Sequence, residues 1–302
     1  MVIADRIGAA INPVLANVSE STGVSLALSI ILYSIQLYAD FSGCIDMARG
    51  ASCMLGIDLD KNFDRPYFSK NMPEFWRRWH ISLFGWFKDY LLYPVSISKL
   101  SKKLGKFFRH TKSKRAGRLV VSAVCLLVVW LATGLWHGAY WTFILWGLFH
   151  GVLLFLSQLT EPWIAKINTK LKVRDSAFGI RFLRCLRTFF LCCVGRIFFR
   201  AATVEDSFTM FRKIFGEFNF ADFATVLKAM KLSIPNMLVI VAGIIILFVV
   251  SLLQRKGELR PRINAKPFPL RWAVLIFLIF GTLIFGMYGV GFSASNFLYA
   301  NF

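Results

Sequence analysis

Six long apolar runs constrain the fold of this chain more than any other feature of its sequence. A helix crosses a bilayer with about 20 consecutive, mostly apolar residues. Runs of this kind lie at residues 24–40, 119–136, 139–158, 182–199, 234–253 and 272–291. With 57% hydrophobic residues in 302, the composition excludes an ordinary soluble domain. The sequence therefore predicts an all-α, polytopic integral membrane protein with about six or seven passages, forming a single membrane domain over residues 1–302.

Glycines and a proline interrupt the apolar regions at Gly43, Gly134, Gly138 and Pro94. Irregular backbone is tolerated at membrane depth only where it is buried in protein or lines a water-filled cavity. We therefore expect some of the passages to be re-entrant.

Three basic clusters lie beside the apolar runs, at about residues 99–118, 166–187 and 255–271. A net charge of +20 would suggest nucleic acid as the partner of a soluble protein. Here the placement matches the excess of Lys and Arg in cytoplasmic loops, so we expect three cytoplasmic loops and no nucleic-acid partner. These loops either face lipid headgroups or form a docking surface for an acidic protein.

Placing the basic clusters in the cytoplasm predicts a topology. The runs 119–136 and 139–158 form a hairpin with its turn at residues 134–140, residues 201–231 lie outside the cell, and Phe302 is also external. His137, within the run WLATGLWHGAYWTFILWGLFHG, then lies at or below the external end of a cavity. A titratable ring at such a depth needs a hydrogen-bonding partner or water and often marks a functional path. The alternative is a histidine that only bonds a neighbouring helix, packed among Gly134, Trp136 and Gly138.

Residues 72–94 combine tryptophan, arginine and histidine in the segment MPEFWRRWHISLFGWFKDYLLYP. We expect one amphipathic, interfacial helix with aromatic anchors. His80 borders the apolar face, where it either points into the protein or is a structural histidine. The residues that share this face are Trp76, Trp79, Leu83, Trp86, Phe87 and Tyr90.

A polar stripe follows helical spacing along the first apolar run, through Ser25, Ser29, Tyr33, Gln36 and Asp40. Polar atoms on one side of a membrane helix are expected to face the bundle or a channel. Gln36 and Asp40 are therefore candidate substrate-binding residues, with a structural role for Asp40 as the alternative.

Five blocks of the sequence resemble a known family over nearly the whole chain. The blocks are VIADRIG, QLYADFSGCIDMARGASCMLGI, NFDRPYFSKNMPEFWRRWHISLFGWFKDYLLYP, TGLWHGAYWTFILWGLFHG and RIFFRA. They resemble the membrane-bound O-acyltransferases of the bacterial alginate O-acetyltransferase type. In this family the histidine of the LWHG block is implicated in catalysis and corresponds to His137. The histidine of WRRWHISL corresponds to His80, a second active-site position, and the neighbouring Trp79 and Trp136 become candidate substrate-binding residues.

The resemblance implies transfer of an acyl group, most simply acetyl, to a hydroxyl of an extracellular polysaccharide or cell-wall polymer. It places the protein in the bacterial cytoplasmic membrane, with acetyl-CoA or an acidic acyl carrier as the cytosolic donor and with extracytoplasmic acetylation proteins as further partners. Neutral His137 would act as general base. His80 would either donate to the developing oxyanion or orient the donor.

No tightly bound cofactor is expected, and the two histidines have no third metal ligand at recognisable spacing. The D-alanyl transfer subunit of teichoic acid modification looks similar but typically carries a WNRWH-type block, where this chain has WRRWH. D-alanyl transfer is therefore one alternative function. A transporter or flippase of an acyl group or lipid-linked glycan is another, and would use the same polar residues without forming an acylated product.

The resemblance begins in the middle of the family, so the helices that precede this point in other members are expected to be absent from the chain. We therefore interpret it as a partial core, either from an incomplete gene model or as a remnant.

Overall fold

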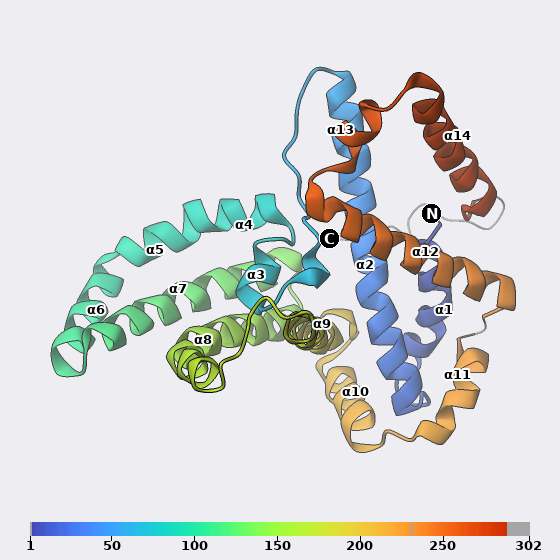
Figure 1. Cartoon of the computed structure of the whole chain (residues 1–302). Coiled ribbons are helices and arrows are strands. Elements are labelled where there is room, and N and C mark those ends of the chain that lie inside the picture. The colour runs from blue at the N-terminus through green and yellow to red at the C-terminus, as the bar shows by residue number, and fades with distance from the viewer. Residues whose placement is uncertain (1, 231, 289–302) are drawn as a thin grey trace. The chain divides into compact units, whose positions relative to one another are not determined.

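The computed structural model describes residues 2–230 and 232–288 (Figure 1). The regular elements of this part are helices, and one isolated β-bridge pairs Phe63 with Trp79. The all-α prediction is therefore confirmed. In chain order the elements are α1 (Ala4–Ala16), α2 (Gly23–Met54), η1 (Pro66–Phe68), α3 (Met72–Trp76), α4 (Ile81–Phe87), η2 (Lys88–Leu92), α5 (Tyr93–Ile97), α6 (Lys99–Thr111), α7 (Lys114–His137), α8 (Trp141–Lys170), α9 (Phe178–Arg200), α10 (Val204–Gly216), η3 (Phe220–Asp222), α11 (Phe223–Ala229), α12 (Ile234–Leu253), η4 (Gln254–Lys256), α13 (Leu259–Asn264) and α14 (Phe268–Phe285).

Five helices of the described residues are long and apolar enough to cross a membrane. They are α2, α7, α8, α12 with its η4 extension, and α14. The fourth expected passage, residues 182–199, does form part of helix α9, but Arg184, Arg187 and Arg196 make it too charged to count among the candidate membrane-crossing helices. The last expected passage ends early, because α14 stops at Phe285. The final residues of that run and the predicted external Phe302 lie outside the described residues.

The chain divides into two compact units, residues 1–50 with 208–302 and residues 51–207. In the first unit, α1 packs closely on α2, because a Cβ added at Gly8 would lie 2.7 Å from Nε2 of Gln36. Arg6 donates a hydrogen bond to Asn236 of α12. On α2, the stripe residues Ser25, Ser29, Tyr33 and Gln36 are buried, and Asp40 is half-buried.

The second unit is built around the antiparallel pair α7 and α8, drawn in green in Figure 1. The predicted hairpin is present with a shorter turn, because Gly134 belongs to helix α7 and residues 138–140 form the connection. Gly147 of α8 lies against the carbonyl of Trp130, leaving no space there for a larger residue. Gly134 faces α8 in the same way, because a Cβ added there would lie 2.6 Å from the carbonyl oxygen of Phe143. Small residues therefore let the two backbones approach.

The expected single helix over residues 72–94 is wrong. The structure has α3, a break before His80, and then α4, the π-helical turn η2 and α5. The break is formed by backbone pairing: Asp64 N donates to Arg78 O at 3.0 Å, and Ile81 N donates to the carbonyl of Asn62 at 3.0 Å. The break also divides the predicted apolar face. Trp76 and Trp79 are buried, whereas Trp86 and Tyr90 are 52% and 65% exposed.

The three basic clusters are mainly helical, and their position in the cytoplasm stays a prediction. Residues 99–118 form α6 and the first turn of α7, each begun by a serine cap: Ser98 accepts from Ser101 N, and Ser113 accepts from Ala116 N. Lysine and arginine are good helix formers, so a basic composition is compatible with a helix. The other two clusters fall on the ends of α8 and α9, and on η4, α13 and the start of α14.

Candidate functional site

His137 is the last residue of α7 and lies at the turn of the α7–α8 hairpin. Gly138 ends the helix with a φ of 150°, a conformation that side chains other than glycine rarely adopt. A Cβ at this position would also lie 2.8 Å from Cε2 of Phe143. Steric constraints therefore explain why the LWHG block ends in glycine. Gly138 turns the chain within one residue and holds His137 against the start of α8.

Aromatic rings surround the imidazole of His137. The ring centroids of Trp136 and Trp146 lie 4.9 Å away, that of Phe199 5.0 Å and that of Phe143 6.1 Å. The side chain is 5% exposed. These rings come from α7, α8 and α9, so the packing of three helices decides the surroundings of this histidine and keeps bulk water away from it.

Arg196 of α9 is a buried cation in the same part of the unit, and sequence reasoning missed it. It is 3% exposed, and its guanidinium carbon lies 4.8 Å from the ring centroid of Trp79 and 5.7 Å from that of Phe199. Its charge acts electrostatically on both His137 and His150. Within residues 51–207, no carboxylate pairs with Arg196, and its Nε has no hydrogen-bond partner.

A buried cation without a counter-ion is costly, because desolvation is not offset by an opposite charge. Stacking on Trp79 offsets part of that cost. A buried cation whose desolvation cost is only partly offset is typical of a site where negative charge arrives with a ligand or develops in a reaction. The signal was present in the sequence as a lone arginine in the apolar stretch CCVGRIFF.

His80 is held by Asn62, a second residue that sequence reasoning missed. The Oδ1 atom of Asn62 accepts from Ser82 N at 2.9 Å and from Ser82 Oγ at 3.0 Å. The same oxygen lies 3.3 Å from His80 Nδ1. Because an amide atom that accepts from a backbone N–H must be the oxygen, Nδ1 of His80 carries the hydrogen, and Nε2 carries the lone pair.

His80 sits outside the membrane-spanning helices, in the left-handed region with a φ of 50° and a ψ of 53°. A residue other than glycine is strained there, and the pairing of residues 62–64 with 78–81 holds it in place. Burial lowers the pKa of the His80 imidazole to about 4. The ring is therefore neutral at pH 7, and its Nε2 accepts hydrogen bonds.

The structure brings four of the six predicted site residues together in the second unit. Trp136 is 48% exposed and lies between the two histidines, 6.0 Å from the ring of His80 and 4.9 Å from that of His137. Trp79 is buried and stacks on Phe75 with ring centroids 5.6 Å apart. Its ring therefore packs against Arg196 and does not face an open surface. The other two, Gln36 and Asp40, belong to the first unit, and their part in the site remains a prediction.

His150, to which the resemblance assigns no role, faces the interior of the bundle. Its ring centroid lies 4.8 Å from that of Trp76 and 5.1 Å from that of Trp146. The backbone of α9 closes over it, since a Cβ added at Gly195 would lie 2.7 Å from its Nε2. Trp146 thus separates two buried histidines, and only His137 lies at the turn. Among the described residues no group of three His, Cys, Asp or Glu could hold a metal ion.

Comparisons with known proteins agree with the family resemblance of the sequence. The profile of the membrane-bound O-acyltransferase (MBOAT) family matches residues 12–111. The probable alginate O-acetylase AlgI of Azotobacter vinelandii is 35% identical over 206 residues, 68% of this chain and 36% of that protein. The peptidoglycan O-acetyltransferase of Helicobacter pylori is 33% identical over 63% of this chain and 31% of its own length. The teichoic acid D-alanyltransferase of Bacillus subtilis is 34% identical over 54% of this chain and 38% of its own length.

The chain therefore spans about a third of the length of the curated relatives that it matches. The matches nevertheless agree with one another, since all three relatives are named as proteins that transfer an acetyl or D-alanyl group. Together they show that residues 12–111 carry a membrane-bound O-acyltransferase family domain, and that the relatives of the chain are named O-acetylase, O-acetyltransferase and D-alanyltransferase.

Proposed function

We propose that this protein transfers an acetyl group from a cytosolic thioester donor to a hydroxyl of an extracellular polysaccharide or cell-wall polymer in the bacterial cytoplasmic membrane. The observation that carries the proposal is the juxtaposition of His137, Arg196 and His80 around Trp136 and Trp79, in a chain whose relatives are named O-acetylase and O-acetyltransferase. A base and a cation in a water-poor aromatic setting match the needs of acyl transfer.

His137 takes the role of general base in this proposal. Its imidazole accepts the proton of the acceptor hydroxyl as the oxygen attacks the thioester carbonyl, forming the new C–O bond. The C–S bond then breaks, and the imidazolium returns the proton to the departing thiolate. Such a proton transfer contributes about 10² to 10⁴ in rate.

Arg196 is the group best suited to stabilise the negative charge that develops on the carbonyl oxygen. It brings a positive charge close to His137, at low dielectric and without a competing carboxylate in residues 51–207. His80 fits this role less well, because its hydrogen faces Asn62 and its Nε2 only accepts. We therefore assign His80 to orienting a hydroxyl or thiol at the site.

The acetyl donor is best tested with membranes that contain this chain. Acetyl-CoA and an acetylated acyl carrier protein, each labelled in the acetyl group, are supplied on the cytoplasmic side, and label on extracellular polymer is measured. His137→Ala is expected to lower the initial rate by about 10² to 10⁴ while the protein inserts at normal levels. His110→Ala removes an exposed histidine of α6 and serves as the matched control with an unchanged rate.

Absence of labelled polymer with the unaltered chain would contradict the proposed function, and so would a near-normal rate in His137→Ala. The similarity to the teichoic acid D-alanyltransferase of Bacillus subtilis favours D-alanyl transfer as the second candidate function. A parallel reaction with a labelled D-alanyl thioester distinguishes the two. Label from D-alanine without label from acetate would assign the chain to D-alanyl transfer.

A further inference from the structure

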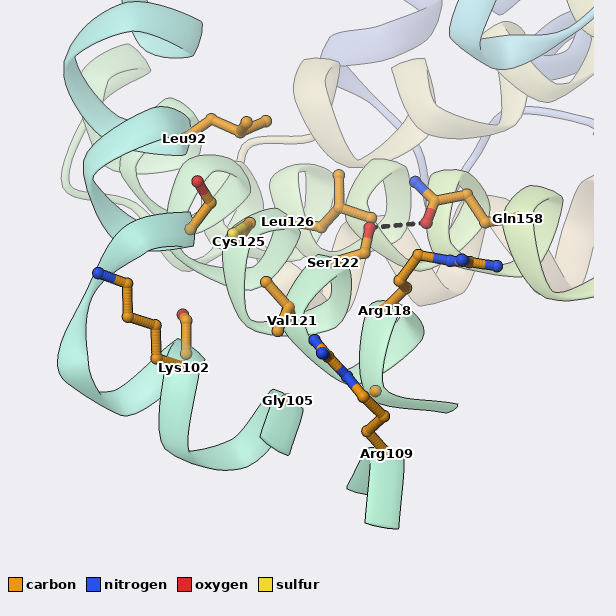
Figure 2. A pocket seen from close by; sticks show the side chains of 13 residues that line it. Leu92, Lys102, Gly105, Arg109, Arg118, Val121, Ser122, Cys125, Leu126 and Gln158 are labelled. Carbon is orange, nitrogen blue, oxygen red and sulfur yellow. Dashed lines mark hydrogen bonds between the residues drawn. The ribbon is translucent and has the colours of Figure 1, made fainter. Parts of the chain in front are cut away.

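A cavity of about 490 Å³ lies between α6 and α7 (Figure 2). Its lining residues on α7 run from Gly117 to Leu126, whereas His137 is the last residue of α7. The cavity has a volume within the range of small-molecule sites. Three cations line it, Lys102 and Arg109 from α6 and Arg118 from α7. We call this cavity the basic pocket. Figure 2 shows Arg109 and Arg118 beside it, with the hydrogen bond from Ser122 Oγ to Gln158 Oε1, 2.6 Å long, drawn as a dashed line.

The cations of the basic pocket have no carboxylate partners within residues 51–207. Two helices with the same sign of charge nevertheless pack tightly here. A Cβ added at Gly117 would lie 2.6 Å from the carbonyl oxygen of Gly105 and 3.2 Å from Cβ of Arg109. The close crossing forces like charges together, and a bound anion would relieve the repulsion.

Ser101 provides a second, independent indication of a ligand. It lines the basic pocket and is fully buried, yet its hydroxyl has no hydrogen-bond partner. A buried hydroxyl without a partner is costly, because it has lost water and gained nothing in exchange. A ligand oxygen in the pocket would satisfy it.

The position of the basic pocket along the membrane helix selects the kind of anion. Arg118 is the last charged residue before the apolar part of α7, so it stands at the boundary between headgroups and hydrocarbon. Apolar side chains line the same cavity, namely Leu92, Val121 and Leu126. Cations beside apolar groups are typical of a surface that faces anionic lipid.

We propose that the basic pocket binds the phosphate group of an anionic phospholipid. The phosphate oxygens accept from the guanidinium groups of Arg109 and Arg118 and from the Ser101 hydroxyl, and the acyl chains lie along the apolar lining residues Leu92, Val121 and Leu126. This site is separate from the acyl-transfer groups at the opposite end of the hairpin, so its test does not depend on enzymatic activity.

The test measures equilibrium binding of dioctanoyl phosphatidylglycerol to the full chain in an uncharged detergent. Dioctanoyl phosphatidylcholine is the zwitterionic reference and is expected to bind at least tenfold more weakly. Arg109→Gln with Arg118→Gln is expected to lower the affinity for phosphatidylglycerol about 30-fold, since each basic residue at an anionic lipid contributes about fivefold. Lys103→Gln with Lys106→Gln removes the same charge from exposed sites of α6 outside the pocket, and a loss below about threefold is expected.

Ser101→Ala distinguishes a ligand contact from a structural role. Affinity is expected to fall about tenfold, as for the loss of a hydrogen bond to a charged group. The unfolding temperature without lipid is expected not to fall, because the hydroxyl has no partner in the protein.

Two results would overturn the proposal. An equal loss of affinity in the arginine and lysine pairs would mean diffuse attraction rather than a site. Tighter binding of CoA or inorganic phosphate than of phosphatidylglycerol, lost in the arginine pair, would assign the pocket to a soluble phosphate instead.

Discussion

The two ends of the α7–α8 hairpin differ in where they keep their polar groups. At the turn, His137 and the nearby Arg196 lie inside a layer of aromatic rings, with side chains 5% and 3% exposed. At the other end, Arg109 and Arg118 stand at the surface around an open cavity. Charge inside a dry site acts strongly on whatever enters it, whereas surface charge acts over a short, screened range. The same hairpin thus separates groups suited to chemistry from groups suited to holding the protein against a charged surface.

Arg196→Gln is the most severe test of this difference. If the buried cation stabilises developing negative charge, the rate of acyl transfer falls about 100-fold, as for loss of one oxyanion-stabilising group. Arg196→Lys keeps the charge and is expected to recover part of the rate. The initial rate and the donor concentration at half-maximal rate are measured separately. An effect on folded yield alone, with a normal rate per folded molecule, would reduce Arg196 to a structural role.

Gly147→Ala tests whether close backbone approach sets the position of His137. The added Cβ would meet the carbonyl of Trp130, so the helices must separate, and the free energy of unfolding is expected to fall by about 2 to 3 kcal/mol. Gly281→Ala on α14 is the matched control, because no atom outside its own helix lies within 4 Å of the added Cβ. The control is expected to be neutral or slightly stabilising. Thermal unfolding in detergent measures both, and equal shifts in the two variants would contradict the close-approach argument.

The pH dependence of stability tests the burial of His80. The folded protein binds this proton only near pH 4, whereas the unfolded chain binds it near pH 6.5. The unfolded state therefore binds more protons between these values, and stability falls as the pH is lowered through this window. Relative to His80→Gln, the unaltered protein is expected to lose about 2 kcal/mol between pH 7 and pH 5. Parallel unfolding curves for the two proteins over this range would show that His80 is open to solvent.

Much of the fold was predictable because the bilayer imposes length and polarity on its helices. The apolar runs at 119–136 and 139–158 appear as α7 and α8, and the glycines of this region serve close packing and the turn. The helix over residues 72–94 was not predictable from periodicity. Its apolar spacing is genuine, but pairing with Asn62 and Asp64 breaks it before His80. Such pairing joins segments that are distant in the sequence, and a helical wheel does not include them.

The candidate site, like the fold, was predictable only in part. An imidazole in an apolar run drew attention to His137, and the same reasoning applied to Arg196 would have found it. No local sequence pattern indicated that Asn62 determines which ring nitrogen of His80 carries the hydrogen.

By itself, the sequence determined that this is a helical membrane protein and that two of its five family blocks carry the candidate histidines His80 and His137. Hydrophobic length and local motifs are properties of neighbouring residues, so the sequence alone reveals them. Only the tertiary structure decided that Arg196 lies beside His137, that His80 is strained, neutral and fixed by Asn62, and that the basic segment 99–118 folds into a helical corner around a cavity. These outcomes depend on the burial of charges and the pairing of backbone between distant segments. Both are set by how the helices pack.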